Sequence, residues 1–483
     1  MHKFEHFFID GQWQDPASDR TVDVVSPSTR TQVGRAPLGV EADIDTAVAA
    51  ARRAFDDGPW PRMTPAERGV ILRRLAEGLM ASGEKIADVM TDEVGTTRAN
   101  NLWIGQAGAG LLHYYAEMAE KDGVEEVRNG LNGTPFTVRH EPVGVVAAIV
   151  PWNSPLFLLM AKIAPALAAG CTIVAKAPEE TPLEFYPLAL AAKEADLPAG
   201  VLNIVTADRE VSEYLVRHAG IDKVSFTGST AAGRRIASIC GNDIKRASLE
   251  LGGKSAAIVL DDASPDTVVQ YALAGGIVPN NGQACMALTR ILLPRARYDE
   301  FAAAITAAVK SLKVGDPWAE DTRIGPLISE RQRDRVEGYI EAGLAEGAHI
   351  TTGGGRPEGL ENGWYVEPTV FTGVDNSMKI AQEEIFGPVL VLIAHDGDDD
   401  AIRLADDSIY GLGGAVFTED PARGFEVARA VRTGSFGLNS YGPDFGAPGG
   451  GFKASGIGRE MGAEGFGVYR ETKTIYGVDP ART

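Results

Sequence analysis

The sequence has few cysteines, no long apolar run and no excess of positive charge, and each shortage excludes a class of protein. It holds 3 cysteines in 483 residues, with no paired spacing, so a disulfide framework is not expected. No apolar stretch reaches the roughly 18 uninterrupted residues of a membrane-spanning helix. The N-terminus also lacks the charged and then apolar order of a signal peptide. We therefore expect a protein of the reducing cytoplasm with no membrane partner.

The charge balance is strongly acidic, with a formal net charge of −20. Such a surface repels nucleic acid and anionic lipid, so neither is expected as a partner. The basic residues Arg331, Arg333 and Arg335 alternate with acids. We interpret them as a solvated helix face. No metal ion is expected.

The chain is longer than one compact core usually holds, which predicts at least two domains. Short β-branched runs alternate with helical stretches, and that rhythm is typical of parallel sheets covered by helices on both faces. Amphipathic spacing predicts a helix over 42–56, and Thr64, Pro65 and Glu67 predict the start of another. The sequence therefore indicates an α/β fold with doubly wound sheets. The expected strands are 144–150, 171–176, 201–205, 223–226, 255–260 and 388–394, and the expected helices are 156–169, 183–195, 209–218, 298–312 and 329–346.

The usual G-x-G-x-x-G fingerprint of dinucleotide binding does not follow any predicted strand. The turn FTGSTAAG (226–233) does follow one, and it places Gly228, Ser229 and Gly233 at the start of a helix, where an anion is favoured. A plain strand-to-helix turn capped by Ser229 is the alternative. Lys176 and Glu179 lie just past another strand, where they either share the two hydroxyls of a ribose or face water.

Three side chains of a possible reaction centre stand at strand ends or in glycine turns. Cys285 closes NNGQAC, Glu250 precedes a Gly-Gly turn in LELGGKS, and Asn153 follows a strand in PWNSP. Cys285 either fills an apolar hole or is a nucleophile, and Glu250 is a helix partner, a buried structural acid or a general base. The Asn153 amide is a candidate oxyanion donor. No histidine has a comparable setting, which disfavours a thiol protease.

The order and spacing of several segments resemble the NAD(P)-dependent aldehyde dehydrogenase superfamily over essentially the whole chain. The resemblance is carried by PWNSP, KAPEETP, FTGSTAAG, LELGGKS, NNGQAC, EEIFGPV (383–389) and GGFKASGIGRE (450–460). It implies an aldehyde-dehydrogenase-like fold of two doubly wound parallel-sheet domains with a small oligomerisation hairpin. The domains implied are an NAD-binding domain over 1–123 and 143–252, a catalytic domain over 253–435, a hairpin and C-terminal strand over 124–142 and 462–483, and a loop over 436–461 that returns to the active site.

The resemblance implies an NAD-dependent oxidation of an aldehyde to the acid. Cys285 would form a thiohemiacetal, Asn153 would hold the oxyanion, hydride would pass to the nicotinamide, and Glu250 would activate water to hydrolyse the thioester. Lys162 and Glu460 match positions of a proton path. The cofactor ligands implied are Lys176 and Glu179 at the adenine ribose, Trp152 and Ser229 at the pyrophosphate, and Glu384 and Phe386 at the nicotinamide ribose. The further cofactor-binding residues expected are Gly228, Gly233 and Leu251. Cys171 and Cys240 are expected in the core.

Several positions of the substrate tunnel depart from the family pattern. Ser154, Leu158, Ala161 and Gly449 stand where large side chains are common, while Ala284 and Met286 flank the nucleophile. The hypothesis is a wide apolar entry that admits medium to bulky aldehydes. Glu179 favours NAD over NADP because it repels a 2′-phosphate, although Lys176 softens this, so NADP remains possible.

The sequence leaves alternatives for the oligomeric state and for the function. The hairpin over 124–142, with its Asn-Gly turn, and the segment 472–478 predict a homodimer or a homotetramer. A CoA-acylating enzyme is the nearest alternative, and Glu250 argues against it because that branch lacks the base. A cysteine hydrolase and a catalytically silent binding protein of the same fold are the others.

Overall fold

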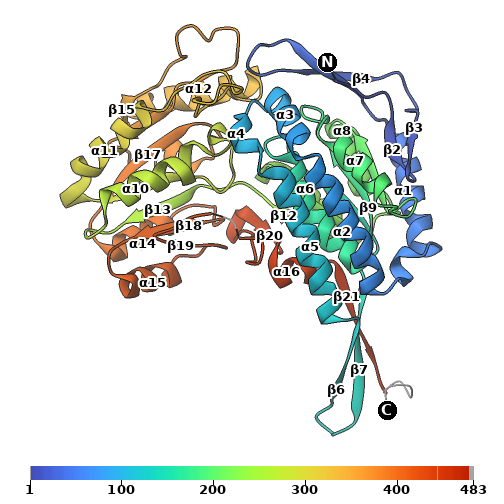
Figure 1. Ribbon diagram of the computed structural model, residues 1–483. Helices are drawn as coiled ribbons and strands as arrows, with labels where there is room; N and C mark the ends of the chain where they lie inside the picture. The colour runs from blue at the N-terminus through green and yellow to red at the C-terminus, as the bar shows by residue number, and fades with distance from the viewer. Residues whose placement is uncertain (1, 443, 478–483) are drawn as a thin grey trace.

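Two large sheets, each covered by helices on both faces, make up most of the chain (Figure 1). The structure is a computed structural model that describes residues 2–442 and 444–477. The last residues of the expected C-terminal segment, 478–483, lie outside the described residues.

The first sheet has eight strands, in the order β20-β12-β11-β8-β9-β10-β2-β3. Its central strands run parallel, while β2, β3 and β20 are antiparallel at the edges. The four β-branched runs expected up to residue 226 are confirmed as strands. The strands are β2 (Phe7–Ile9), β3 (Gln12–Gln14), β8 (Val145–Ile149), β9 (Thr172–Ala177), β10 (Leu202–Thr206), β11 (Lys223–Thr227), β12 (Arg246–Glu250) and β20 (Gly456–Ile457).

Helices bury both faces of this sheet, and strand β8 shows how. Its side chains alternate between two apolar clusters: Val146 and Ala148 pack on one side, and Val145, Ala147 and Ile149 on the other. A strand buried in this way reads as a continuous apolar run, which is why the sequence signal was strong. The helices are α1 (Glu41–Asp56), α2 (Pro65–Ala81), α3 (Gly83–Glu93), α4 (Arg98–Asn101), α5 (Ile104–Asp122), α6 (Pro155–Ala169), α7 (Phe185–Glu194), α8 (Arg209–Arg217) and α9 (Thr230–Asp243).

The predicted start of helix α2 is confirmed in detail. The Thr64 hydroxyl accepts from the Glu67 backbone N–H at 3.3 Å, and the Glu67 carboxylate accepts from the Thr64 N–H at 2.7 Å. Pro65 occupies the first helical position, where its missing N–H has no partner to lose. Cys171 and Cys240 are buried, as expected.

The second sheet has seven strands, in the order β15-β16-β17-β14-β13-β18-β19. All neighbours run parallel except β15 and β16. Its strands are β13 (Ser255–Val259), β14 (Leu288–Pro294), β15 (His349–Thr352), β16 (Thr369–Thr372), β17 (Val389–His395), β18 (Gly414–Phe417) and β19 (Gly437–Leu438). The helices are α10 (Pro265–Tyr271), α11 (Tyr298–Lys310), α12 (Glu330–Ala345), α13 (Lys379–Gln382), α14 (Asp398–Asp406), α15 (Pro421–Ala430) and α16 (Gly462–Gly467), the last of which packs on the first sheet's helices.

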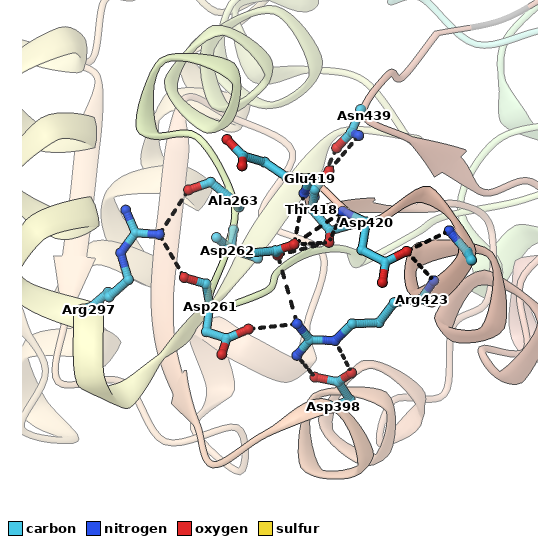
Figure 2. Close-up of polar contacts among 12 residues, drawn as sticks. Asp261, Asp262, Ala263, Arg297, Asp398, Thr418, Glu419, Asp420, Arg423 and Asn439 are labelled. Atoms are coloured by element: carbon cyan, nitrogen blue, oxygen red, sulfur yellow. Dashed lines mark hydrogen bonds and ion pairs between the residues drawn. The ribbon is translucent and has the colours of Figure 1, made fainter.

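Ion pairs and hydrogen bonds join three segments at one end of the second sheet (Figure 2). The Arg423 guanidinium, from α15, pairs with Asp398 at 2.6 Å and with Asp261 at 2.7 Å. The Asp262 carboxylate accepts from the Thr418 hydroxyl and from the backbone N–H groups of Glu419 and Asp420. The contacts fasten the turn after β13 to the start of both α14 and α15, so this acidic cluster is structural.

A hairpin projects from the body of the molecule beside the last described strand (Figure 1). It consists of β6 (Glu125–Asn129) and β7 (Pro135–Pro142), and β21 (Arg470–Ile475) pairs antiparallel with β7. The expected hairpin and third strand are confirmed, and they pair within one chain. A further small sheet joins β1 (His2–Lys3), β5 (Gln32–Pro37) and β4 (Thr21–Val25).

Candidate active site

The loop before Cys285 has a backbone that few sequences tolerate. Asn280 and Asn281 take left-handed conformations, with φ of 48° and 57°. Asparagine adopts this region more readily than most residues because its short side chain bonds locally. Gly282 follows with φ of 78°, and a Cβ there would lie 2.3 Å from the Gly387 carbonyl carbon. The run NNGQAC is therefore a tight turn that presents Cys285.

Buried side chains hold this turn in place. The Asn281 amide donates to the carbonyls of Gly95 and Pro326, at 3.1 Å and 2.9 Å, and accepts from the Gly325 N–H at 2.8 Å. The Gln283 carboxamide accepts from the Ile328 N–H at 3.1 Å. Both side chains are buried and bonded, so the position of the cysteine is fixed by distant parts of the chain.

Asn153 is tied to the same turn. Its Nδ2 donates to the Gln283 carbonyl at 2.8 Å, and the side chain is buried. An amide nitrogen carries two hydrogens, and the second is free to donate elsewhere. Next to it, the Ser154 hydroxyl accepts from Asn280 Nδ2 at 2.7 Å. Asn153 thus stands against the cysteine loop, as an oxyanion donor must.

The C-terminal loop brings a second carboxylate toward Glu250. Strand β20 pairs with β12, which sets Gly456 opposite Glu250, and a bridge between Gly449 and Glu460 turns the loop inward. Glu460 forms a buried ion pair with Lys162, whose Nζ also donates to the Thr227 hydroxyl at 2.7 Å. Lys162 and Glu460 therefore meet, as the sequence led us to expect.

Burial dominates the titration of the central groups. It raises the pKa of Glu250 well above the usual range, Glu460 adds to the rise, and Lys162 and Arg459 oppose it. Glu250 Oε1 is buried with no hydrogen-bond partner among the described residues. Burial also raises the pKa of the Cys285 thiol to about 12, helped by the charges of Glu384 and Glu250. The cysteine is thus a neutral thiol in the free protein at pH 7.

A pair of buried carboxyl groups anchors the helix that carries Lys162. The Glu184 carboxyl accepts from the Leu156 N–H, in the first turn of α6, at 2.5 Å. Glu93 accepts from the backbone N–H groups of Leu183 and Glu184, at 2.9 Å and 3.1 Å. Burial raises the pKa of Glu184 to about 8 and that of Glu93 well above its usual range. The pair fixes the start of α6 beside Asn153.

A cavity of about 420 Å³, here the central cavity, runs past these groups. Trp152 and Phe386 meet edge to face across it, with ring centroids 5.4 Å apart. Phe386 holds a left-handed φ of 65°, a strained conformation of the kind that clusters at functional sites. Glu384 accepts from the Gly253 N–H at 3.0 Å. The lining residues are Pro151, Trp152, Asn153, Leu158, Thr227, Gly228, Ser229, Leu251, Gly252, Cys285, Arg331, Gln332, Arg335, Glu384 and Phe386.

Some expected cofactor residues lie outside this cavity. Lys176 lies near the end of β9 and Glu179 in the turn after it; neither lines the cavity, and each is partly exposed. Gly233 packs against Leu251, because a Cβ there would lie 2.4 Å from that side chain. Ser229 caps α9 by accepting from the Ala232 N–H at 3.3 Å, and together with Gly228 it also lines the cavity, so the capped start of the helix lies at the cavity wall.

Only one expected tunnel residue, Leu158, lines the central cavity. Ala161 has no exposed surface. Ala284 and Met286 are partly exposed beside Cys285, and the Met286 carbonyl accepts from the Tyr441 hydroxyl at 2.6 Å. Gly449 is partly exposed in its bridge to Glu460.

The interpretation of the α12 arginines as a solvated face was wrong for Arg333 and holds for Arg331 and Arg335, whose side chains are exposed. Arg333 is buried, and Arg335 donates to the Glu384 carbonyl at 2.6 Å. Gln332 donates to the Phe386 carbonyl at 2.7 Å, and with Arg331 and Arg335 it lines the central cavity. Arg331 and Arg335 are one turn apart, a spacing that puts them on one helix face. That spacing was the signal available in the sequence.

Comparison with known proteins identifies the family. The model of the aldehyde dehydrogenase family matches residues 13–475. A geranial dehydrogenase of Castellaniella defragrans is 46% identical over 474 residues, covering 98% of both chains. The crystal structure of a Mycobacterium tuberculosis aldehyde dehydrogenase with NAD+ has a TM-score of 0.96 at 46% identity, with 98% of each chain covered.

The chain belongs to the aldehyde dehydrogenase family. A further relative, a 3-succinoylsemialdehyde-pyridine dehydrogenase of a Pseudomonas species, is 42% identical and matches 99% of this chain and 100% of its own. The predicted fold class is confirmed, and so is the predicted reaction: the enzyme oxidises an aldehyde with NAD.

The described residues contain neither a cluster of metal ligands nor a membrane-spanning helix. Within 2–442 and 444–477, no three His, Cys, Asp or Glu side chains are grouped as metal ligands. No helix in the same ranges combines the length and hydropathy that a membrane crossing needs.

Proposed function

We propose that Cys285 is the nucleophile of this aldehyde dehydrogenase. Its sulfur attacks the aldehyde carbon, and the thiol proton ends on the former carbonyl oxygen, which gives a thiohemiacetal. The Asn153 amide and the Cys285 backbone N–H stabilise the negative charge on that oxygen as it develops. The support for this role is the hydrogen bond that holds the Asn153 amide against the turn carrying Cys285.

Glu250 is the base of the second half of the reaction. The thiohemiacetal carbon would give its hydride to bound NAD while its hydroxyl group loses the proton to solvent, which leaves the acyl group as a thioester on Cys285. Glu250 removes a proton from water, the hydroxide attacks the thioester carbon, and the carboxylic acid leaves while the sulfur regains a proton. Lys162 and Glu460 carry the proton away from Glu250, because their buried pair adjoins it.

The cofactor is held by residues of the central cavity and the turn beside it. Bound NAD supplies the hydride acceptor. Lys176 and Glu179 bind the adenine ribose, and Ser229, Gly228 and Trp152 hold the pyrophosphate at the α9 N-terminus. Gly233 and Leu251 shape that turn. Glu384 binds the nicotinamide ribose, with Phe386 packed behind it.

A single observation carries this assignment: Cys285, Asn153, Ser229 and Glu384 line one cavity. A thiol, an amide donor, a helix N-terminus and a carboxylate thus face the same space. Glu250 adjoins it with a buried carboxyl oxygen that has no hydrogen-bond partner among the described residues and is the acceptor we assign to the hydrolytic water. We assign cofactor binding to 1–123 and 143–252, catalysis to 253–435, and the completion of the active site to the returning loop 436–461.

The test follows absorbance of reduced nicotinamide with a panel of aldehydes. Cys285→Ala is expected to abolish turnover, while the matched control Cys240→Ala retains it. Glu250→Gln is expected to release about one equivalent of NADH rapidly and then stall, because the thioester is not hydrolysed. Turnover in Cys285→Ala would refute the assignment. Faster turnover with added CoA, and formation of acyl-CoA, would place the enzyme in the acylating branch.

The substrate is a medium to bulky apolar aldehyde. An aromatic strip lies next to Leu158: Phe157 packs against Trp103 at 5.1 Å and against Phe445 at 5.8 Å between ring centroids. Trp103 is 42% exposed, so a hydrophobic ring edge faces solvent there. Aromatic faces bind unsaturated and ring-bearing groups well. The relative named a geranial dehydrogenase fits this class.

The substrate assignment has its own test. We expect citral and benzaldehyde to have a higher kcat/KM than acetaldehyde, and Trp103→Ala to narrow the difference, with the exposed Trp318→Ala as control. Acetaldehyde ahead of both bulky aldehydes would contradict it.

The projecting hairpin is proposed to join subunits in a homodimer or a homotetramer. Val127, Leu131, Ile475 and Tyr476 are exposed on the hairpin and the β21 end. Exposed apolar side chains gathered on one projection mark an interaction site. Analytical ultracentrifugation of Leu131→Asp tests this, since a variant that keeps the wild-type mass would refute it. A reducing cytoplasm suits an enzyme whose nucleophile must stay a thiol.

A further inference from the structure

Arg331 lies between the two halves of the molecule. It belongs to the first turn of α12, next to the second sheet, and it lines the central cavity. Its guanidinium is 3.4 Å from the Glu180 carboxylate, in the turn after β9 of the first sheet. Glu180 directly follows Glu179, so Arg331 reaches the proposed adenine-ribose site from the opposite side.

The contact with Glu180 is too weak to explain the position of this arginine. The Arg331 side chain is 84% exposed, and Glu180 is 27% exposed. An exposed ion pair at this separation contributes at most about 1 kcal/mol. The guanidinium is therefore able to leave Glu180 at little cost when a stronger anion is present.

The charges around the ribose site nearly balance. Glu179, Glu180 and Asp208 are acidic, and Asp208 is already paired with Arg20 at 2.8 Å. Lys176 and Arg331 are basic. Burial raises the pKa of Glu179, and the charges of Glu180 and Asp208 add to this rise. Lys176 and Arg331 both lower the pKa of Glu179, so both cations act on this one carboxylate. Lys176 pairs through its backbone in β9, while neither its ammonium nor the Glu179 carboxylate has a hydrogen bond or an ion pair with the side chain of another described residue.

We propose that Arg331 binds the 2′-phosphate of NADP and thereby lets this enzyme use NADP as well as NAD. The inference rests on the proposed placement of the adenine ribose at Lys176 and Glu179. With NAD, Glu179 accepts from the free 2′-hydroxyl and Arg331 stays with Glu180. With NADP, the guanidinium turns to the phosphate, whose oxygens match its planar donors, and Lys176 supplies a second positive charge.

The experiment compares kcat/KM for the two cofactors at a saturating aldehyde concentration. Arg331→Gln is expected to lower the value for NADP about tenfold, the loss of one charge-assisted contact at an exposed site, and to change that for NAD less than about twofold. Glu180→Gln is expected to raise the NADP value, because it releases Arg331 and removes a repelling charge. Arg323→Gln is the matched control, an exposed arginine outside the cavity.

Binding without aldehyde separates this inference from the catalytic proposal. Quenching of tryptophan fluorescence, to which Trp152 in the cavity contributes, gives Kd for NADP and NAD in each variant. A selective weakening of NADP binding in Arg331→Gln supports the inference even if no aldehyde is oxidised. Equal losses for both cofactors, or no NADP binding by the wild type, would overturn it.

Discussion

The buried pair of Lys162 and Glu460 allows a sharp prediction. Lys162 has no exposed surface, and the Glu460 side chain is 6% exposed. Lys162→Met removes the cation and leaves the carboxylate in a place that water does not reach. Removing one partner of a buried ion pair costs about 3–5 kcal/mol. The urea midpoint of unfolding should therefore fall by this loss of stability divided by the urea dependence of the wild-type protein, which the same titration gives.

The double variant Lys162→Met/Glu460→Leu is the control, because it removes both charges. Its midpoint should lie closer to the wild type than that of Lys162→Met. The pH dependence of thioester hydrolysis moves in opposite directions in the two proteins. Lys162 lowers the pKa of Glu250 and Glu460 raises it more strongly, so the single variant shifts the profile to higher pH and the double variant to lower pH. A single variant as stable as the wild type, or a double variant no better than the single, would refute the reasoning.

Three further predictions concern residues away from the reacting atoms. Glu184 keeps its proton up to about pH 8 in the folded protein but loses it near 4.5 when unfolded, so stability falls between those values by up to about 1.4 kcal/mol per pH unit. Urea titrations at pH 5 and pH 8 measure this loss of stability with rising pH, and Glu184→Gln should make it smaller. An unchanged pH dependence in the variant would contradict the role given to Glu184. Asn281→Ala leaves three buried backbone groups unpaired and should lower the free energy of unfolding by about 3 kcal/mol or more. It should also lower kcat, and a wild-type kcat would show that the turn holds Cys285 without Asn281. Arg423→Met should lower Tm at low salt and much less at 1 M salt, because the lost pairs are partly exposed; a salt-independent loss would point to packing.

Much of the fold was predictable because its signals are local. The capping box at Thr64 and Glu67 needs only four consecutive residues, and the apolar runs of the central strands need only five to eight. The hairpin over 124–142 was predictable from an Asn-Gly turn between two segments in which polar and apolar residues alternate. Such patterns fix the type and bounds of an element without reference to the rest of the chain.

The candidate site was predictable in part, and the errors have one physical cause. Cys285, Asn153 and Glu250 were found because glycine turns and strand ends mark them in the sequence. Arg331 and Arg335 are exposed as predicted, but their place in the lining of the cavity was missed, because the partner of Arg335 lies in the segment around Glu384. Ala161 was expected in the tunnel, yet its neighbours cover it completely. A helical pattern gives a residue's face and leaves open what covers that face.

The sequence by itself determined the elements, the parallel sheets and the chemistry of the reacting groups, since these depend on neighbours along the chain. The tertiary structure alone decided which distant groups meet. Lys162 and Glu460 are 298 residues apart, and strand β20 must pair with β12 before they touch. Arg331 reaches Glu180 only because the two sheets face each other across the central cavity. Contacts of this range are set by packing of the whole chain, and no local periodicity encodes them.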